Sequence, residues 1–342
     1  MPTASIDFTM ATLAIIMVTA GAIYGVNMVA APYLETDSSE TRFYQIGRSI
    51  LLSEGNPINW GTGALPTSFG LADGAEAYSL DIDKVTRLNP DNQYAINYST
   101  IWRTLGVDDV SIRMEVSLLY DLSLSFESSI DNGDNTTYTF QAICTKDGFP
   151  VESDMSYYVA IRSSTYHASG TTSNEGIGTV QFTIPDSQSG TAMLVGFSKI
   201  QDSMITYDVL PFGHQSGSPQ PVNTYATLSP LNHILYPAVT KGSSINAVVF
   251  SNDYAFNLSA SGSDYLIPSL KDGSPMILVL TGLDGVDYWA EYVAYPQIPL
   301  EIGSTMDSDY ILSDVSTCTY LVDVEGNHYK LTMQFRSPEE YD

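Results

Sequence analysis

The sequence predicts an α+β protein in which a long N-terminal hydrophobic helix is followed by mainly antiparallel β-sandwich domains. No charged residue occurs between Asp7 and Glu35, and residues 10–31 are apolar over a length that can cross a bilayer as a helix. From Val110 onward, apolar and polar residues alternate in short runs separated by turn residues. This alternation is typical of antiparallel strands with one buried face.

The composition indicates a folded, acidic protein. The 342 residues exceed the length of one ordinary domain. Lys and Arg number 13 against 39 Asp and Glu, which gives a net charge of −26, so a nucleic-acid partner is not expected. The 23 Tyr, 12 Phe and 3 Trp supply more burial than a disordered chain carries. Tyrosine at this frequency suits sugar-binding or adhesive surfaces as well as half-buried strands.

The apolar segment at residues 10–31 has two interpretations. It forms a membrane-spanning helix that packs on copies of itself, or it is a secretory signal cleaved near its end. The basic start of a secretory signal is missing, because Arg42 is the first Lys or Arg in the chain. Gly21 and Gly25 have the GxxxG spacing that lets neighbouring helices approach closely. The preferred interpretation is therefore a helix that enters a membrane and then self-associates.

The stretch at residues 5–8, which reads SIDF, together with the apolar run after it resembles the N-terminus of archaeal type IV pilin-like proteins with class III signal peptides. The resemblance implies cleavage between Pro2 and Thr3, which would make Asp7 the fifth residue of the mature chain. A carboxylate there is favoured by the helix dipole and can pair with the terminal amine of a neighbouring subunit. The alternative for Asp7 is an ordinary helix cap. The expected subunit-assembly residues are Asp7, Phe8, Gly21 and Gly25.

An amphipathic helix is predicted for residues 36–52, where Phe43, Ile46 and Ile50 have helical spacing. Gly55 and the Asn-Pro pair after it end this helix. The expected parts are the N-terminal helix at residues 1–54, a connecting α/β region at residues 55–120, a β-sandwich at residues 121–200 and a second β-rich domain at residues 201–342. Further segments that resemble the archaeal surface family are residues 69–72, 80–88 and 295–303.

The β-rich part begins with a predicted hairpin whose turn is residues 131–135, reading DNGDN. Its clustered oxygens fail the spacing of an EF-hand loop, so no metal site is expected there. Residues 139–198 resemble an immunoglobulin-like or carboxypeptidase-regulatory-type sandwich of surface proteins. A polar stretch rich in Pro and Gly, residues 213–223, reads as a loop between the two β units.

Two kinds of covalent modification are compatible with the sequence. Cys144 and Cys318 can form one disulfide in an oxidising compartment, or they are two separate thiols. Asn97, Asn135 and Asn257 each begin an Asn-X-Ser/Thr sequon and are possible glycosylation sites. Both features agree with a location outside the cell.

The sequence contains no recognisable catalytic motif, so the chain is not expected to be an enzyme or to use a cofactor. It has no HExxH, no CxxC pair, no GxSxG, no Walker loop and no GxGxxG after a strand. The histidines that could ligate a metal are scattered, at His167, His214, His233 and His328. The acidic pairs that could act as a carboxylate dyad are Asp284 with Asp287 and Asp307 with Asp309.

Three functions follow from these observations. The preferred one is a structural subunit of an extracellular, type IV pilus-like filament that assembles through the N-terminal helix. The alternative is a cell-surface adhesion or binding protein that uses this helix only as a membrane anchor. The third is a surface enzyme with an unrecognised carboxylate site.

Overall fold

The structure is a computed structural model that describes residues 37–107, 109–201, 203–216, 218–270, 273–304 and 315–336. The chain divides into two compact units, residues 1–48 and 49–342. In the first unit, the described part is the beginning of helix α2 (Asp37–Leu52). The predicted helix at residues 10–31 and the assembly residues Asp7, Phe8, Gly21 and Gly25 lie outside the described residues.

The predicted α+β class is wrong, because the described residues form a mainly β fold with five four-stranded antiparallel sheets. Besides α2, its helices are η1 (Trp60–Thr62), α3 (Ile82–Thr86) and α4 (Tyr98–Leu105). None of the helices in the described ranges is long and apolar enough to span a membrane. α2 is amphipathic and carries Asp, Glu and Arg side chains, and the others are short. The predictions of a transmembrane helix and of a pilin-like, helix-led architecture are therefore corrected to an all-β architecture.

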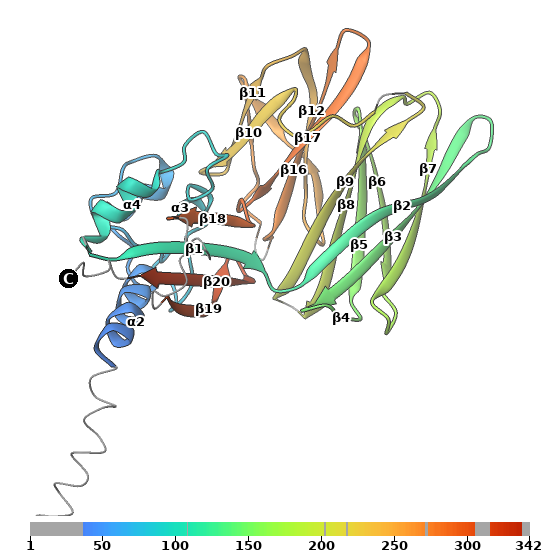
Figure 1. Cartoon of the computed structure of the whole chain (residues 1–342). Helices are drawn as coiled ribbons and strands as arrows, with labels where there is room; N and C mark the ends of the chain where they lie inside the picture. The colour runs from blue at the N-terminus through green and yellow to red at the C-terminus, as the bar shows by residue number, and fades with distance from the viewer. Residues whose placement is uncertain are drawn as a thin grey trace, which may run out of the picture. The chain divides into compact units, whose positions relative to one another are not determined.

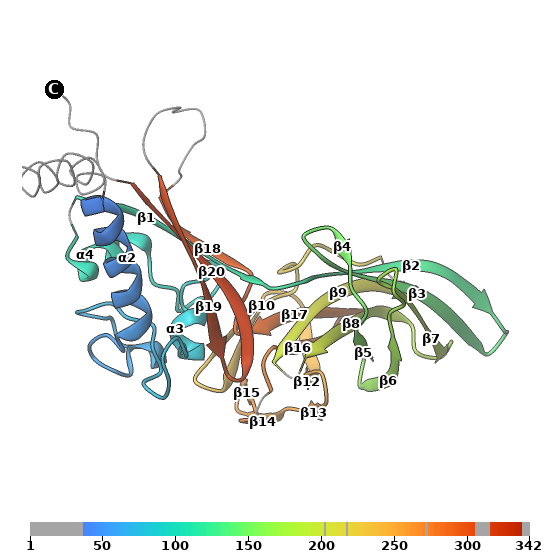
Figure 2. The ribbon, with the colours of Figure 1, turned by 90° about the horizontal axis from the view of Figure 1, so that it is seen from below.

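Three of the five sheets stack in layers within the second unit (Figures 1 and 2). The outer sheet contains β2 (Asp121–Asp131), β3 (Asn135–Lys146), β4 (Phe149–Pro150) and β7 (Ile177–Pro185). The central sheet contains β6 (Ser164–Thr171), β5 (Asp154–Ile161), β8 (Gly190–Gln201) and β9 (Met204–His214), in that order. The third sheet contains β13 (Ala255–Asn257), β12 (Ser243–Phe250), β16 (Met276–Asp284) and β17 (Asp287–Tyr295), in that order.

The inner strands β5 and β8 of the central sheet are buried on both faces. Successive residues of a strand point to opposite faces. Accordingly, Tyr157 and Val159 of β5 pack in a core with the outer sheet, whereas Tyr158 and Ala160 pack in a second core with the third sheet. The Tyr158 ring stacks on Phe250 of the third sheet, with centroids 4.9 Å apart. Double-sided burial explains why β5 and β8 read as nearly continuous apolar runs instead of alternating ones.

The other two sheets complete the second unit. The hairpin sheet has the order β10 (Ala226–Leu231), β11 (Ile234–Val239), β15 (Asp264–Leu266) and β14 (Ser259–Ser261). The terminal sheet has the order β18 (Leu300–Gly303), β1 (Ser111–Leu118), β20 (Asn327–Arg336) and β19 (Ser316–Val324). β1 therefore pairs with two strands from the end of the chain, and its alternating Ile112, Met114 and Val116 are buried.

The connecting region is fixed by buried charged side chains. Lys84 Nζ donates to the Ala72 carbonyl at 2.7 Å, and the Arg87 guanidinium donates to the Trp60, Ala64 and Tyr94 carbonyls. These bonds satisfy two cations that would otherwise be buried at a large cost in free energy. They hold the loop that follows α3 in place, and this loop forms one wall of the site described below.

Asp83 docks this region on the tight turn between β10 and β11. One of its carboxylate oxygens accepts hydrogen bonds from the Asn232 amide and the Tyr295 hydroxyl, both at 2.7 Å. Asn232 and His233 have φ values of 50° and 55°, as a two-residue type I′ hairpin turn requires. The contact joins residues far apart in the sequence through one buried carboxylate.

The packing of Trp289 gives a test of this fold. A Cβ atom on Gly282 would overlap the Trp289 indole and the Ser243 carbonyl, and the indole also stacks on Tyr225 at 5.5 Å. We expect Gly282→Ala to lower the free energy of unfolding by about 1–3 kcal/mol, because the core cannot accept the extra methyl group. The control is Gly170→Ala, where the nearest atom to a new Cβ is 4.0 Å away. Denaturant unfolding measures both, and equal midpoints for the two variants would contradict the packing.

Candidate functional site

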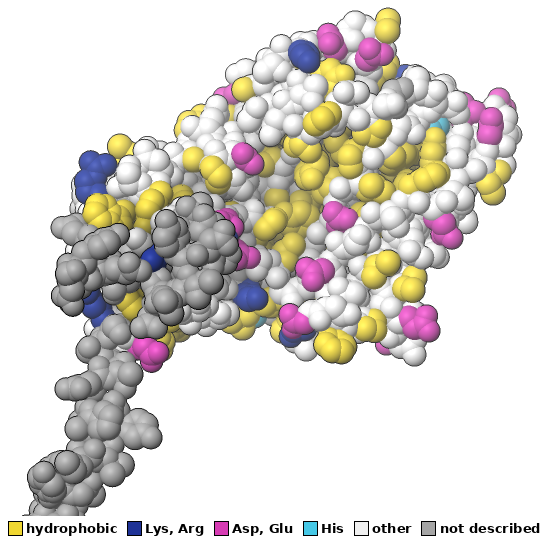
Figure 3. Space-filling view, in the orientation of Figure 1, with side chains coloured by type: hydrophobic (Ala, Val, Ile, Leu, Met, Phe, Trp, Pro, Cys, Tyr) yellow, Lys and Arg dark blue, Asp and Glu magenta, His cyan; other side chains and the backbone are white. Residues whose placement is uncertain are grey.

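The candidate site is a recess of about 410 Å³ in the second unit. Its walls come from β9, β10 and β17, the end of β1, and the segments at residues 89–91 and 297–299. This volume is within the range of about 300–1,000 Å³ that is usual for small-molecule sites. Figure 3 shows hydrophobic side chains gathered in a hollowed band on this face, with acidic side chains around it. The site is built from strand ends and loops that the layered sheets hold in place.

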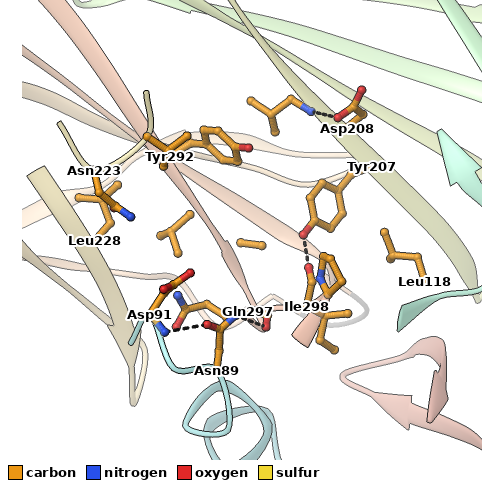
Figure 4. A pocket seen from close by; sticks show the side chains of 15 residues that line it. Asn89, Asp91, Leu118, Tyr207, Asp208, Asn223, Leu228, Tyr292, Gln297 and Ile298 are labelled. Atoms are coloured by element: carbon orange, nitrogen blue, oxygen red, sulfur yellow. Dashed lines mark hydrogen bonds between the residues drawn. The ribbon is translucent and has the colours of Figure 1, made fainter. Parts of the chain in front are cut away.

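Tyr207 of β9 forms one aromatic wall of the recess (Figure 4). Its hydroxyl donates to the Ile298 carbonyl. Burial raises the pKa of Tyr207 well above its ordinary value, so the hydroxyl keeps its proton and remains a donor at neutral pH. The hydrogen bond fixes the ring on the segment that follows β17.

Tyr292 of β17 is the second aromatic wall, and its hydroxyl has no hydrogen-bond partner among the described residues. Burial raises its pKa, and the charges of Asp208 and Glu291 raise it further. Asp208 itself is held by the backbone, because its carboxylate accepts from the Leu124 amide at 2.7 Å and the Val209 amide at 2.8 Å. The recess therefore contains a carboxylate that is hydrogen-bonded to the backbone and a phenol hydroxyl that has no hydrogen-bond partner among the described residues.

A set of side-chain amides lines the opposite wall (Figure 4). Asn89 donates to the Gln297 carbonyl at 3.0 Å and accepts from the Asp91 amide at 2.9 Å. Gln297 is only 6% exposed, and its Oε1 accepts from Asn92 Nδ2 at 2.6 Å. Its Nε2 has no partner among the described residues. Both N–H groups of this amide are therefore without a protein partner among the described residues, at the wall of the recess.

Glu291 positions the loop that carries Asn223. Its two carboxylate oxygens accept from the Asn223 and Tyr225 backbone amides, each at 2.9 Å. Burial raises the pKa of Glu291, and these backbone hydrogen bonds partly oppose the increase. Asn223 has a φ of 68°, in the left-handed region that Asn tolerates better than most residues. The side-chain amide of Asn223 has no partner among the described residues and lines the recess.

A second hollow of about 550 Å³ shares Leu118, Tyr207 and Pro299 with the recess. It contains Lys146 and Lys330, and the ammonium group of Lys146 lies 5.3 Å from the centre of the Tyr120 ring. Its acidic lining residues are Glu115, Asp121 and Asp147. The two hollows therefore lie side by side and share a wall at Leu118, Tyr207 and Pro299.

The structure does not bring the two cysteines together. Cys144 is buried on β3 and its Sγ lies 3.3 Å from Ser198 Oγ, whereas Cys318 is on β19 of the terminal sheet, and both are free thiols. The sequon residues lie apart from the recess. Asn97 caps α4 by accepting from the Thr100 amide at 2.8 Å, Asn135 begins β3, and Asn257 ends β13. Asn97 and Asn257 are exposed, and Asn135 is half-buried.

The predicted candidates for chemistry that lie in the described ranges are spread over separate elements. Asp284 and Asp287 flank the turn between β16 and β17, and Asp307 and Asp309 lie outside the described residues. His214 is buried and structural: its Nε2 donates to the Pro185 carbonyl and its Nδ1 accepts from the Tyr138 hydroxyl. No group of three or more His, Cys, Asp or Glu side chains in the described ranges is arranged to hold a metal.

Sequence reasoning missed the residues that line the recess. Tyr207, Asp208, Tyr292 and Gln297 come from separate segments, and no spacing rule joins them. The signals in the sequence are the high tyrosine content and the stretch at residues 295–303, which resembles the archaeal surface family but indicates no binding site. Only the tertiary pairing of the strands places these side chains together.

Comparisons with known proteins show no family for the chain, because no family model and no curated protein matches it. Among solved structures, it is similar to β-glucosidase 3B from Thermotoga neapolitana in complex with glycerol, with 14% identity and a TM-score of 0.18. That match covers 28% of this chain and 16% of the glucosidase. It is also similar to HBP35 of Porphyromonas gingivalis, with 11% identity and a TM-score of 0.20, over 52% of this chain and 64% of HBP35. The chain thus spans less than two thirds of each, and similarities this low support no functional argument.

The buried carboxylates give a pH prediction. Burial raises the pKa of Asp83 and Glu291 above their ordinary values of 3.8 and 4.5. Between the ordinary pKa and the raised pKa, the folded chain keeps a proton on each of these carboxyls that the unfolded chain has released. Folding therefore becomes less favourable as the pH rises from the ordinary pKa values to the pKa values of the folded state. Asp83→Asn keeps an oxygen that can accept from Tyr295 and Asn232 and removes the charge.

We expect the Asp83→Asn variant to lose less stability than the unaltered chain when the pH rises from about 4 to 7. Thermal unfolding at several pH values measures this difference. The control is Glu76→Gln, which removes one negative charge from an exposed site. An Asp83→Asn profile parallel to that of the unaltered chain would show that Asp83 has no raised pKa in the folded state.

Proposed function

We propose that the chain is a non-catalytic ligand-binding or adhesion protein of the cell surface. The observation that carries this proposal is the state of the polar groups in the recess. The Asp208 carboxylate and the Tyr207 hydroxyl are already bonded to the backbone, so they can shape a binding site but are poorly placed to exchange protons with a substrate. The groups without protein partners are those that could bind a ligand.

The surface location is supported by features outside the recess. The net charge of −26 keeps the exterior strongly solvated, and the exposed Asn97 and Asn257 are accessible for glycosylation. A scaffold of stacked antiparallel sheets is suited to presenting a rigid surface, although fold alone does not determine function. The filament interpretation depends on Asp7, Phe8, Gly21 and Gly25, so it gains no support from the described residues. Self-association remains a prediction from the sequence.

The proposal predicts that attachment of cells to their natural substratum depends on the recess. We expect Tyr292→Ala to lower attachment at least several-fold, because it removes both a ring wall and the free hydroxyl. The matched control is Tyr254→Ala, which removes an exposed tyrosine that does not line the recess. Attachment is counted after washing, and the amount of surface chain is measured by protease accessibility on intact cells. Equal attachment by both variants, or a chain that is inaccessible on intact cells, would contradict the proposal.

A further inference from the structure

We propose that the recess binds a neutral saccharide. This inference rests on the proposed function and specifies the ligand class of the same site. Four properties of the recess carry it: two tyrosine rings, several free hydrogen-bonding groups of both kinds, a negative local charge and a second hollow beside it.

The tyrosine rings fit the apolar face of a sugar ring. A pyranose presents C–H groups on a face, and these carry a slight positive charge that is attracted to the negative face of an aromatic ring. Tyr207 and Tyr292 come from different sheets and lie on the same side of the recess in Figure 4. Because the Tyr207 hydroxyl is bonded to the Ile298 carbonyl, its ring is already fixed before a ligand arrives. A fixed ring loses less conformational entropy on binding.

The free polar groups match hydroxyls, each of which can both donate and accept. The Gln297 side chain is more than nine-tenths buried, and its unpartnered Nε2 can only donate. The Asp91 carboxylate can only accept, and no hydrogen bond to it is found among the described residues. The Tyr292 hydroxyl and the Asn223 amide can do both. A ligand with several adjacent hydroxyls satisfies all four groups, whereas an apolar ligand would bury the Gln297 donor without a partner.

The local charge argues against phosphate or nucleotide ligands. Within the described ranges no Lys or Arg lines the recess, while Asp91 and Asp208 do. A divalent cation lacks the ligand cluster it would need among the described residues. A cationic peptide would meet the exposed Asp91 carboxylate, while Asp208 is held in place by two backbone hydrogen bonds. Exposed ion pairs contribute little to affinity, so a neutral ligand suits the recess better.

The second hollow indicates that the saccharide is longer than one unit. It shares a wall with the recess at Leu118, Tyr207 and Pro299, so a saccharide with one unit in the recess has a second hollow beside it for a further unit. Lys146 and Lys330 in this hollow are accompanied by three acidic residues, so the hollow adds no net positive charge that would select an anionic sugar. We therefore expect tetrasaccharides to bind more tightly than disaccharides.

The test is calorimetric titration of the full chain with glucose-, galactose- and mannose-based di- and tetrasaccharides, and with di- and tetragalacturonic acid as anionic counterparts. We expect at least one neutral tetrasaccharide to bind. Tyr292→Ala should weaken binding about tenfold or more, Tyr292→Phe by only a few-fold because the ring remains, and Gln297→Leu by about tenfold. Tyr254→Ala should bind as the unaltered chain does. Circular dichroism checks that each variant is folded. If Tyr292→Ala does not fold, Tyr292→Phe and Gln297→Leu still test the recess.

Two results would overturn the saccharide inference. One is a panel in which no neutral sugar binds, or only the galacturonic acids do, while cell attachment still depends on Tyr292. In that case the recess binds another class of ligand and the proposed function stands. The other is neutral saccharide binding that Tyr292→Ala and Gln297→Leu leave unchanged, which would place the sugar outside the recess. Attachment that is independent of Tyr292 would instead contradict the proposed function itself.

Discussion

The burial of β5 and β8, the inner strands of the central sheet, on both faces is the constraint on which the rest of the second unit depends. Tyr157 and Tyr158 are neighbours in β5, yet each is buried in a different core. A strand in this position cannot shift its register by one residue without exchanging its two sets of side chains. A buried aliphatic or aromatic side chain contributes about 1.5–3 kcal/mol, so both cores together fix β5 and β8 strongly. The outer and third sheets are held in place by this central layer.

The recess is formed at the edges of these stacked sheets. β9 is the edge strand of the central sheet and β17 is the edge strand of the third sheet, and each contributes one tyrosine to the recess. Buried hydrogen bonds fix the remaining walls: Glu291 holds the loop of Asn223, and Asn92 holds Gln297. The site is therefore formed before a ligand binds, so binding needs little conformational change.

The sequence predicted local elements better than it predicted how they are arranged. The hairpin turn at residues 131–135 is confirmed, since β2 ends at Asp131 and β3 begins at Asn135, and the amphipathic helix predicted for residues 36–52 matches α2. The predicted fold class was wrong because strands make up most of the described residues and the helices among them are few and short. The recess could not be predicted, because the pairing of sheets far apart in the sequence has no local signal.

Hydrogen–deuterium exchange of the full chain, alone and with the tightest-binding tetrasaccharide of the titration panel, tests the central claim most directly. The account predicts that the amides of β5 and β8 exchange most slowly in both samples, because both faces of their sheet are buried. It also predicts that added saccharide protects the segments at residues 222–225 and 297–299 and the part of β9 around Tyr207. Fast exchange in β5 and β8, or protection confined to segments that do not line the recess, would contradict it.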